Sequence, residues 1–262
     1  MGIHMVEVGQ GMGCPECGGP LKVQAGEAIV TCEYCGSDVN LAVGTKYFLK
    51  HTIIPSKITQ EGAVNAVKSW MKRGFLKPSD LARKSKITRL ELQFLPMFVV
   101  HVVARTKYDG LLTRTGQNIE KKGELVKEYY WEVLGRRASS FPTRSYEVPL
   151  SHKVDFDTSR LEKGAKFLNS EIDEKQAESI AKGEIEEHHK FLLKTELDVT
   201  HSMTTTFDFK DTEFLHIPAW FVSYEYRGKI YELILDGATG DDIKAEIPSM
   251  EKNGLMGKLF GA

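Results

Sequence analysis

The sequence lacks an apolar segment long enough to cross a membrane. Its longest strongly apolar run covers the ten residues 95–104 and includes His101, whereas a membrane-spanning helix needs about 20 residues. The first thirteen residues also lack the basic segment and the apolar stretch of a secretory signal. These two absences predict an intracellular, cytoplasmic protein with no integral membrane association.

Neither sign of charge is in excess over the whole chain. The 262 residues include 35 lysines and arginines and 36 aspartates and glutamates, which gives a net charge of −1. A chain this close to neutrality is not attracted as a whole to nucleic acid or to an acidic membrane. Only a local cluster of basic residues can therefore point to such a partner.

Short motifs that mark common enzyme sites are also missing. The sequence has no G-x-x-x-x-G-K-[ST] phosphate loop, no G-x-S-x-G nucleophile turn and no H-E-x-x-H metalloprotease helix. We therefore predict that the protein is not an enzyme and takes no small-molecule substrate. The alternative is an enzyme with its site between two α+β units, near Glu184, His188 or His101.

Cysteine is scarce, and its four residues lie close together in the sequence. They form two C-x-x-C pairs with 14 residues between the pairs, at Cys14, Cys17, Cys32 and Cys35. A glycine after each second cysteine lets backbone N–H groups point toward sulfur. Two disulfides are the alternative, but an intracellular chain rarely keeps them. Because four thiolates leave no open position on a tetrahedral metal, we predict one structural zinc ion.

The segment from residue 12 to about residue 43 resembles a zinc ribbon of the transcription-factor-B type. The resemblance rests on the two cysteine pairs and on the short strand patterns LKVQ and AIVTC. It implies a module that docks on proteins or nucleic acid in the transcription and translation machinery, without naming a partner. We place this zinc ribbon at residues 1–45.

The rest of the chain shows the same order of patterns twice. A strand pattern at residues 46–55 precedes a helix that starts after Thr59, and strand patterns follow to residue 154. A second helical region at residues 159–193, interrupted at Asn169, again precedes antiparallel strands. The sequence thus predicts an α+β fold, in which an N-terminal zinc ribbon is followed by a duplicated helix-plus-antiparallel-sheet body.

A shift of 122 positions brings matching residues of the two units together. It places Leu92 on Phe214, Pro96 on Pro218, Phe98 on Trp220 and Val100 on Val222. A chance match is the alternative, because proline is common at the first residue of a strand. We draw the units at residues 46–145 and 146–248, followed by a tail at residues 249–262.

The spacing of apolar residues predicts which face of each helix is buried. In the first helix, the residues that recur at helical spacing are Ala63, Val67, Trp70 and Met71. In the second helical region, the predicted buried face contains Ala177, Ala181, Ile185, His188 and Leu192. We interpret His188 as a core histidine whose ring is hydrogen-bonded to a neighbouring side chain.

Basic residues are concentrated in one stretch. Between residues 64 and 90, one acid, Asp80, is accompanied by eight basic residues: Lys68, Lys72, Arg73, Lys77, Arg83, Lys84, Lys86 and Arg89. The loop at residues 134–144 adds Arg136, Arg137 and Arg144. We predict that these residues bind nucleic acid by neutralising phosphates. The alternative is that they are only solvated, or that they pair with the acidic second helix.

The tail contains a small group of apolar residues at helical spacing. These are Leu255, Met256, Leu259 and Phe260, at positions i, i+1, i+4 and i+5. So short a segment buries too little area to hold a membrane by itself. We predict that these residues dock on a partner or back on the fold.

The whole chain resembles archaeal proteins in which a zinc ribbon precedes a duplicated α+β body, and more narrowly an archaeal ribosome dimerisation factor. The resemblance rests on the zinc-ribbon start and the Lys/Glu-rich composition. It implies a non-enzymatic homodimer that docks on the small ribosomal subunit and keeps ribosomes idle. The residues themselves predict the coarser function of binding a ribosomal subunit or another ribonucleoprotein. A zinc-ribbon adaptor in transcription or at the membrane surface is the alternative.

Overall fold

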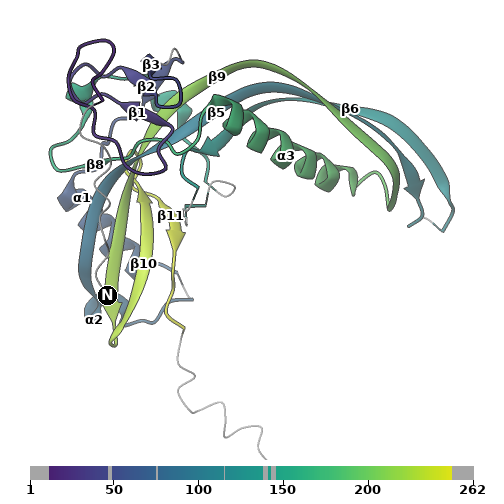
Figure 1. Ribbon diagram of the computed structural model, residues 1–262. Helices are drawn as coiled ribbons and strands as arrows, with labels where there is room; N and C mark the ends of the chain where they lie inside the picture. Colours follow the sequence, from purple (N-terminus) through teal and green to yellow (C-terminus); the bar gives the residue numbers. More distant parts are fainter. Residues whose placement is uncertain are drawn as a thin grey trace, which may run out of the picture.

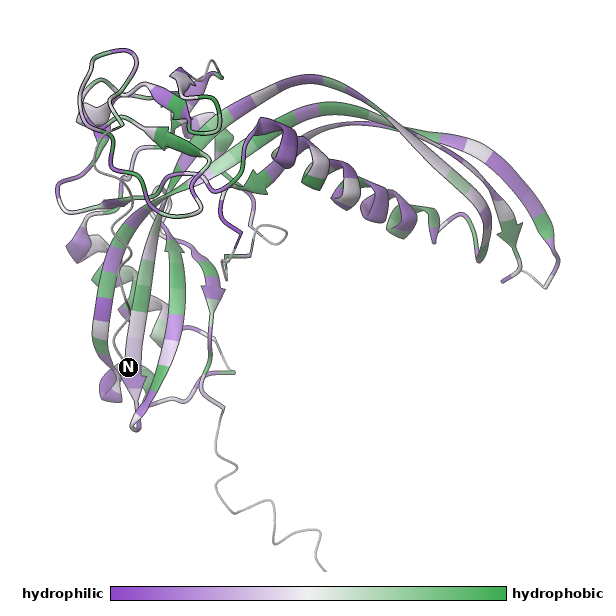
Figure 2. Ribbon diagram, in the orientation of Figure 1, coloured by the Kyte–Doolittle hydropathy of each residue, from purple (hydrophilic) through white to green (hydrophobic). Residues whose placement is uncertain are grey.

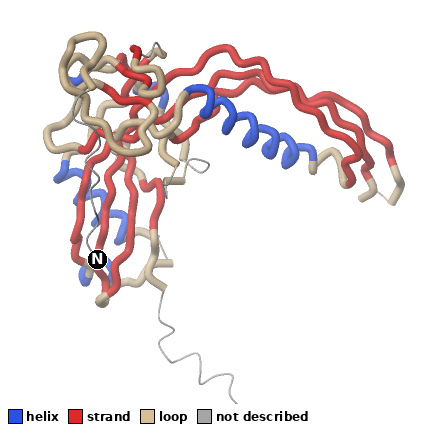
Figure 3. The backbone as a smooth tube through the Cα atoms, viewed as in Figure 1, coloured by secondary structure: helices blue, strands red, loops and turns tan. Residues whose placement is uncertain are grey.

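A computed structural model shows a body from which a long curved arm extends (Figure 1). The residues that the structure describes are 12–46, 49–74, 76–114, 116–137, 141–142 and 146–249. Strands make up most of this chain and helices are few, as the tube in Figure 3 shows. The predicted α+β class is therefore confirmed.

The elements fall into an amino-terminal module and a larger body. The module contains three short antiparallel strands: β1 (Ile29–Thr31), β2 (Asp38–Asn40) and β3 (Thr45–Lys46). The body contains, in chain order, β4 (His51–Ile53), α1 (Gln60–Lys72), α2 (Leu81–Lys84), β5 (Lys86–Leu112), β6 (Ile119–Leu134), β7 (Val154–Asp155), β8 (Lys166–Phe167), α3 (Glu174–Leu193), β9 (Val199–Tyr226), β10 (Lys229–Asp236) and β11 (Asp242–Ala245). Two 3-10 turns, η1 (Leu150–His152) and η2 (Thr158–Arg160), flank β7. All eight strands of the body belong to one sheet.

Two very long strands, β5 and β9, form the centre of this sheet. They have 27 and 28 residues and pair antiparallel along nearly their whole length. The carboxyl-terminal half of β5 turns back into β6, and the carboxyl-terminal half of β9 turns back into β10. As a result, β6, β5 and β9 continue into the arm, whereas β5, β9, β10 and β11 form the sheet of the body (Figure 1).

The pairing of β5 with β9 places the two predicted units about a local two-fold axis. Leu95 pairs with Ile217, and these residues are 122 positions apart. A two-fold rotation about the midpoint of this antiparallel pair superposes residues of β5 on the residues 122 positions later in β9. Two of the three irregularities in the ladder obey the same relation, because it skips Thr88 in β5 and Lys210 in β9, which are 122 positions apart. The predicted duplication of the body is therefore confirmed.

The turns that follow the two hairpins are built alike. The N–H of Gly135 donates to the carbonyl of Pro96 at 2.7 Å, and the N–H of Gly237 donates to that of Pro218 at 2.9 Å. A Cβ atom on Gly135 would lie 3.0 Å from the Pro96 Cβ, and one on Gly237 would lie 2.7 Å from the Pro218 Cβ. Glycine is required at both turns because no side chain fits against the proline.

A serine in each unit forms a hydrogen bond with the glycine turn of the other unit. The Ser56 hydroxyl donates to the carbonyls of Ile58 and Gly237, each at 3.2 Å. The Ser170 hydroxyl donates to the carbonyl of the second following residue at 2.8 Å and to Gly135 at 3.1 Å. The two units therefore interlock across the two-fold axis.

The two long helices start at matching distances from these serines. The Thr59 side chain caps α1 by accepting from the N–H of Gly62, and Asp173 with Gln176 forms a capping box at α3. The caps are 114 positions apart, so α1 residues correspond to α3 residues 114 later. Both helices pack on the face of the sheet formed by even-numbered residues such as Phe94 and Phe98. Hydrophobic and hydrophilic bands accordingly alternate along the arm strands in Figure 2.

The predicted second helical region is too long at its start. Residues 159–173 contain a 3-10 turn and β8, and α3 begins only at Glu174. Two local features oppose a helix there. Gly164 has a φ of 84°, which ends any helical turn. The backbone of Ser170 bonds to the amino-terminal module instead of to a helical neighbour.

The buried face of α1 matches its prediction, but that of α3 does not. The buried residues of α1 are Ala63, Val67, Trp70 and Met71. Those of α3 are Ala177, Ala181, Ile185, His189 and Leu193, so the prediction of His188 and Leu192 is wrong. The buried residues are four apart, and each such step turns about 40° around the helix. The buried row therefore winds around α3 as the helix follows the curved arm.

Candidate metal centre and the surfaces around it

The four predicted cysteine ligands meet at one point of the amino-terminal module. Their sulfur atoms all lie within 4.8 Å of one another. The Sγ atoms of Cys14 and Cys35 are 3.7 Å apart, and those of Cys17 and Cys32 are 3.8 Å apart. A disulfide requires about 2.05 Å, whereas a tetrahedral zinc with Zn–S bonds of about 2.3 Å spaces its sulfurs roughly 3.8 Å apart. The cysteines are thus positioned to hold one metal ion, and their spacing is compatible with zinc.

Two turns of the same design present these sulfurs. The N–H of Gly18 donates to the carbonyl of Cys14 at 2.8 Å, and that of Gly36 donates to Cys32 at 2.9 Å. Gly18 and Gly36 each have a φ of 74°, in the left-handed region that favours glycine. The glycine that follows each second cysteine is therefore needed to close the turn.

The protein environment prepares part of the cluster for a cation. Hydrogen bonds from Ser37 lower the pKa of the Cys35 thiol to about 6, so this sulfur is a thiolate at neutral pH. At Cys17 the N–H of Gly19 lowers the thiol pKa, but hydrogen bonding with the neighbouring sulfurs and burial outweigh it and raise that pKa to about 12. Four sulfurs this close cannot all be negative without a cation among them.

The ribbon is joined to the body through β1. The N–H groups of Ala28 and Ile29 donate to the carbonyl of Ser170 at 2.7 and 3.2 Å, and the N–H of Ser170 donates to Ile29 at 3.1 Å. The Ile29 side chain is fully buried in the core that contains Phe98 and Val133. The metal-binding module and the sheet therefore share a core residue.

A chain of buried polar groups also crosses from the ribbon to the sheet. Thr31 Oγ1 donates to Asp38 Oδ1 at 2.7 Å, and Asp38 Oδ2 lies 2.9 Å from His51 Nδ1. His51 Nδ1 has no hydrogen-bond partner among the described residues, so this close contact lacks the geometry of a hydrogen bond. His51 Nε2 lies 2.8 Å from His216 Nδ1, and His216 Nε2 donates to the carbonyl of Leu168 at 2.9 Å. Burial and the nearby His51 lower the pKa of His216 well below its usual value.

The structure places the eight basic residues of the predicted stretch at the end of α1, on α2 and at the start of β5. Five of these side chains are exposed and make no ion pair among the described residues: Lys68, Lys72, Arg73, Arg83 and Lys86. We call these five residues the basic surface. Because they are free of acidic partners there, their charge is available to an incoming anion.

Lys77 has a structural partner instead. Its Nζ donates to the carbonyl of Trp70 at 2.6 Å and lies 3.6 Å from the centroid of the Trp70 ring. Burial lowers the pKa of Lys77. Lys77 therefore closes the last turn of α1 rather than facing a partner.

Two further cations of the stretch are held in ion pairs, one with a half-buried acid and one with an exposed acid. Lys84 lies 2.7 Å from Asp80, and Arg89 lies 2.6 Å from Glu91. The Lys84 ammonium lowers the pKa of Asp80. The exposed Arg89–Glu91 pair contributes little free energy, so an anionic partner can exchange for Glu91 at small cost.

The structure describes two of the three basic residues predicted in the second group. Arg136 is partly buried, pairs with Glu171 at 2.8 Å and donates to the carbonyl of Asn169 at 3.2 Å. Arg137 donates its backbone N–H to the same Glu171, and Arg144 lies outside the described residues. The predicted docking residues of the tail, Leu255, Met256, Leu259 and Phe260, lie outside them as well.

A hollow of about 360 Å³ next to Arg136 contains an acid that the sequence did not nominate. Its lining includes Glu132, Glu184 and Arg137. Burial raises the pKa of Glu132 to about 7. Nothing in the local sequence marked this residue, because it alternates with apolar neighbours like any exposed strand residue.

The candidates for acid–base chemistry are not brought together. Glu184 accepts a hydrogen bond from the indole N–H of Trp131 at 2.9 Å, and His188 contacts that indole ring on the same side of the sheet. His101 is bonded to Glu128 at 2.6 Å and lies at an odd position of β5, on the opposite face of the sheet from α3. The three side chains therefore do not converge on one site.

The buried histidine of α3 is His189, which sequence reasoning missed. Its Nδ1 lies 2.6 Å from Thr106 Oγ1, and its Nε2 lies 2.9 Å from the hydroxyl of Tyr129. Thr106 is itself bonded to Thr205 at 2.8 Å. This network joins α3 to three strands of the arm, so the expected role of a core histidine belongs to His189.

Similarity to known proteins adds nothing to these observations. Comparisons with models of protein families, with curated proteins and with solved structures find no match to this chain. Within the part of the chain that the structure describes, no helix is long and apolar enough to span a bilayer. The function is therefore inferred from the residues and their geometry.

Proposed function

We propose that the protein is a non-enzymatic docking protein, folded around one zinc ion, that binds a ribonucleoprotein through its basic surface. The observation that carries this proposal is the grouping of Lys68, Lys72, Arg73, Arg83 and Lys86 on ordered elements without acidic partners among the described residues. Cations fixed in this way release counterions when they contact a phosphate backbone. The zinc ribbon on the same body is the kind of module that such docking proteins use.

The small ribosomal subunit is the partner that we propose. The resemblance to an archaeal ribosome dimerisation factor supports this choice and adds a homodimer that keeps ribosomes idle. One feature of the arm suits a dimer contact, because β6 is 16 residues long and, among the described residues, pairs only with β5. An open strand edge of this length can pair with a second chain.

The dimer contact has its own test. Val126 and Tyr130 of β6 are 43% and 61% exposed. We expect Val126→Lys with Tyr130→Lys to convert a dimer into a monomer, as measured by size-exclusion chromatography with light scattering. A dimer that survives both changes would place the contact elsewhere.

The docking itself is tested by sedimentation. Purified protein is mixed with small ribosomal subunits and run on sucrose gradients at several salt concentrations. We expect co-sedimentation whose affinity falls steeply with salt. Protein that stays at the top of the gradient at every salt concentration would contradict the proposal.

A matched pair of variants makes this test specific. The test variant carries Lys68→Glu, Lys72→Glu and Lys86→Glu. The control carries the same change of charge at exposed lysines elsewhere, namely Lys163→Glu, Lys175→Glu and Lys229→Glu. We expect only the test variant to lose binding, with the slope of log affinity against log salt reduced by about 2 to 3. Equal losses in both variants would show that only net charge matters.

A further inference from the structure

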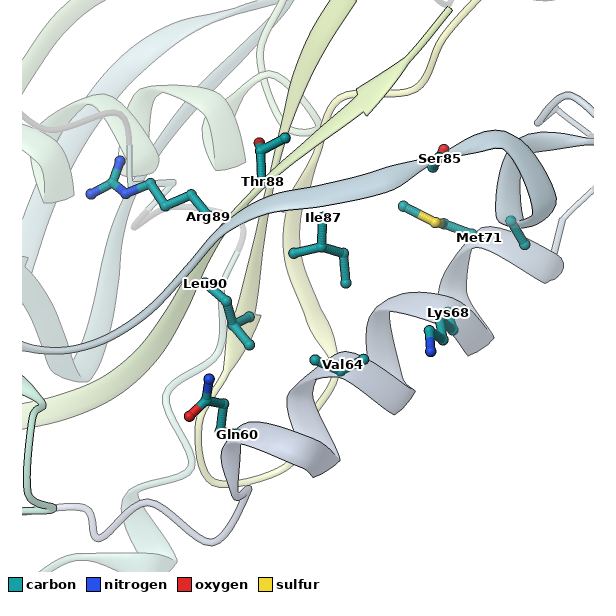
Figure 4. A pocket seen from close by; sticks show the side chains of 10 residues that line it. Gln60, Val64, Lys68, Met71, Ser85, Ile87, Thr88, Arg89 and Leu90 are labelled. Atoms are coloured by element: carbon teal, nitrogen blue, oxygen red, sulfur yellow. The ribbon is translucent and has the colours of Figure 1, made fainter.

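A hollow of about 460 Å³ opens between α1 and the start of β5 (Figure 4). The apolar side chains of its lining are Val64, Met71, Ala82, Ile87 and Leu90, and the polar ones are Gln60, Lys68, Ser85, Thr88 and Arg89. Ile87 and Leu90 point from the strand toward the helix in Figure 4. The hydroxyl oxygen of Ser85 is buried and has no hydrogen-bond partner among the described residues.

The two-fold relation shows what this hollow lacks. Lys68 of α1 corresponds to Lys182 of α3, and Ser85 corresponds to Phe207 of β9. In the second unit, the Lys182 ammonium lies 5.6 Å from the centroid of the Phe207 ring. The first unit has the lysine but only a serine hydroxyl in place of the ring. An aromatic ring is therefore missing beneath Lys68.

The backbone beside the hollow is also incomplete. On one side, residues 86–92 of β5 pair with β9. On the other side, β8 begins to pair only at Gln93 and β6 only at Met97. The outer edge of residues 86–92 therefore has no strand partner among the described residues, and an extended chain can add a strand there.

The charges around the hollow select an acidic occupant. Lys68, Arg83 and Lys86 are exposed and make no ion pair among the described residues. A second copy of this chain is a poor occupant, because pairing the same edge about a two-fold axis would bring like charges together. A nucleic-acid strand satisfies the cations but offers no N–H and C=O ladder to the strand edge.

We infer that this hollow binds an extended acidic peptide segment of another protein. The segment adds a strand to the outer edge of residues 86–92, inserts an aromatic side chain beneath Lys68, and directs its carboxylates toward Arg83 and Lys86. The inserted ring then takes the place that Phe207 occupies in the second unit. This site shares Lys68, Arg83 and Lys86 with the proposed docking on RNA, and differs from it in its apolar lining and strand edge, which do not contact phosphates.

The test uses the full zinc-loaded protein and a fluorescein-labelled peptide of sequence EDVFVDE. We expect saturable binding by fluorescence anisotropy. Ser85→Phe gives the first unit the ring that the second unit has and should fill the hollow, so we expect affinity to fall about tenfold or more. Replacing the peptide's phenylalanine by alanine should weaken binding to a similar degree. Lys68→Met, which cannot overfill the hollow, provides a second variant with the same expected direction.

Hydrogen exchange then locates the peptide. We expect bound peptide to slow amide exchange at residues 86–92, whereas Lys72→Glu, outside the lining, should leave peptide affinity unchanged and weaken only ribosomal docking. No saturable binding, or equal affinity for Ser85→Phe and the natural chain, would overturn the inference. Protection of residues 86–92 by a twelve-nucleotide oligouridylate but not by the peptide would overturn it in favour of RNA. Failure of ribosomal docking with intact peptide binding would sink only the proposed function.

Discussion

The first half of the body runs from β4 to β6, and the second half runs from β8 to β10. The two halves make the same kind of contact with each other, which we call the junction, but their helices and hairpins differ in length. In each half a serine hydroxyl bonds the glycine turn of the other half, and the N-cap residue of a helix lies three residues after that serine. The helices differ in length, with 13 residues in α1 and 20 in α3. The hairpins differ as well, with 16 residues in β6 and 8 in β10.

The length of each helix matches the length of the hairpin on which it packs, and that hairpin belongs to the other half. The short α1 packs on Leu233 and Leu235 of the short β10, whereas the long α3 packs on Val133 of the long β6. A buried helix needs apolar surface along its length. The lengths of helix and hairpin are therefore linked across the two-fold axis, while the junction itself is kept.

The amino-terminal module, which carries the four cysteines, breaks the symmetry between the halves. Its β1 strand bonds the backbone of Ser170 in the second half, and no such bond from the ribbon reaches Ser56 among the described residues. Removal of zinc should therefore separate the halves more than any other change. With Cys32→Ser we expect a loss of several kcal/mol of stability. Amide exchange should rise around Ser170 and stay slow around Ser56.

The control for zinc removal is a substitution in the same module that touches no sulfur. Val43 is 67% exposed, so Val43→Ser should change stability by less than about 0.5 kcal/mol. Zinc content, measured by atomic absorption, should fall only in the Cys32 variant. Equal acceleration of exchange at both serines would contradict the asymmetry.

The glycine turns test whether the two junctions are equivalent. Gly135→Ala and Gly237→Ala each push a Cβ against a proline, at 3.0 and 2.7 Å. We expect each to cost about 1 to 3 kcal/mol by chemical denaturation. Gly183 in α3 has nothing within 4 Å of an added Cβ, so Gly183→Ala should instead stabilise by up to about 1 kcal/mol. A large loss at one turn and none at the other would break the two-fold relation.

The loss of stability at acidic pH should also differ between the halves, with a smaller effect than the substitutions above. Burial lowers the pKa of His216 and of His189, both in the second half, so the folded protein keeps them neutral. The unfolded chain binds a proton at each below about pH 6.5. The contribution of these two histidines to the free energy of unfolding is therefore constant above that pH. Below it, we expect a fall of up to about 1.4 kcal/mol per pH unit for each histidine.

The counterpart of His216 in the first half is Phe94, which supplies the variant for this test. His216→Phe should lower stability at neutral pH, because the bond to Leu168 is lost. It should also reduce the slope of stability against pH below about pH 6.5. Urea unfolding at several pH values measures both effects, and an unchanged slope would assign the acid sensitivity to other groups.

The parts of this structure that the sequence predicted are those with a short or a regular signature. The cysteine ligands are fixed by two local turns, and the match between the long strands follows from a shift of 122 positions. The unbroken length of β5 was not predicted, because proline usually starts a strand, whereas Pro96 lies inside β5. The contact of His51 with His216 joins residues 165 positions apart, and no local pattern marks such a pair.

Substitutions at the ends of the two helices should have the smallest effects. They also distinguish residues that stabilise the fold from residues that bind the partner. The last turn of α3 is closed by Thr195, whose hydroxyl donates to the carbonyl of Leu192 at 2.8 Å, and that of α1 is closed by Lys77 on Trp70. Lys77→Met keeps the apolar stem over the ring but removes the donor, so we expect a loss of about 1 kcal/mol and unchanged co-sedimentation with ribosomal subunits. Lys72→Glu, on the same turn, should weaken co-sedimentation and leave stability within about 0.5 kcal/mol. If Lys77→Met instead reduced docking as much as Lys72→Glu does, Lys77 would have to leave Trp70 when the partner binds.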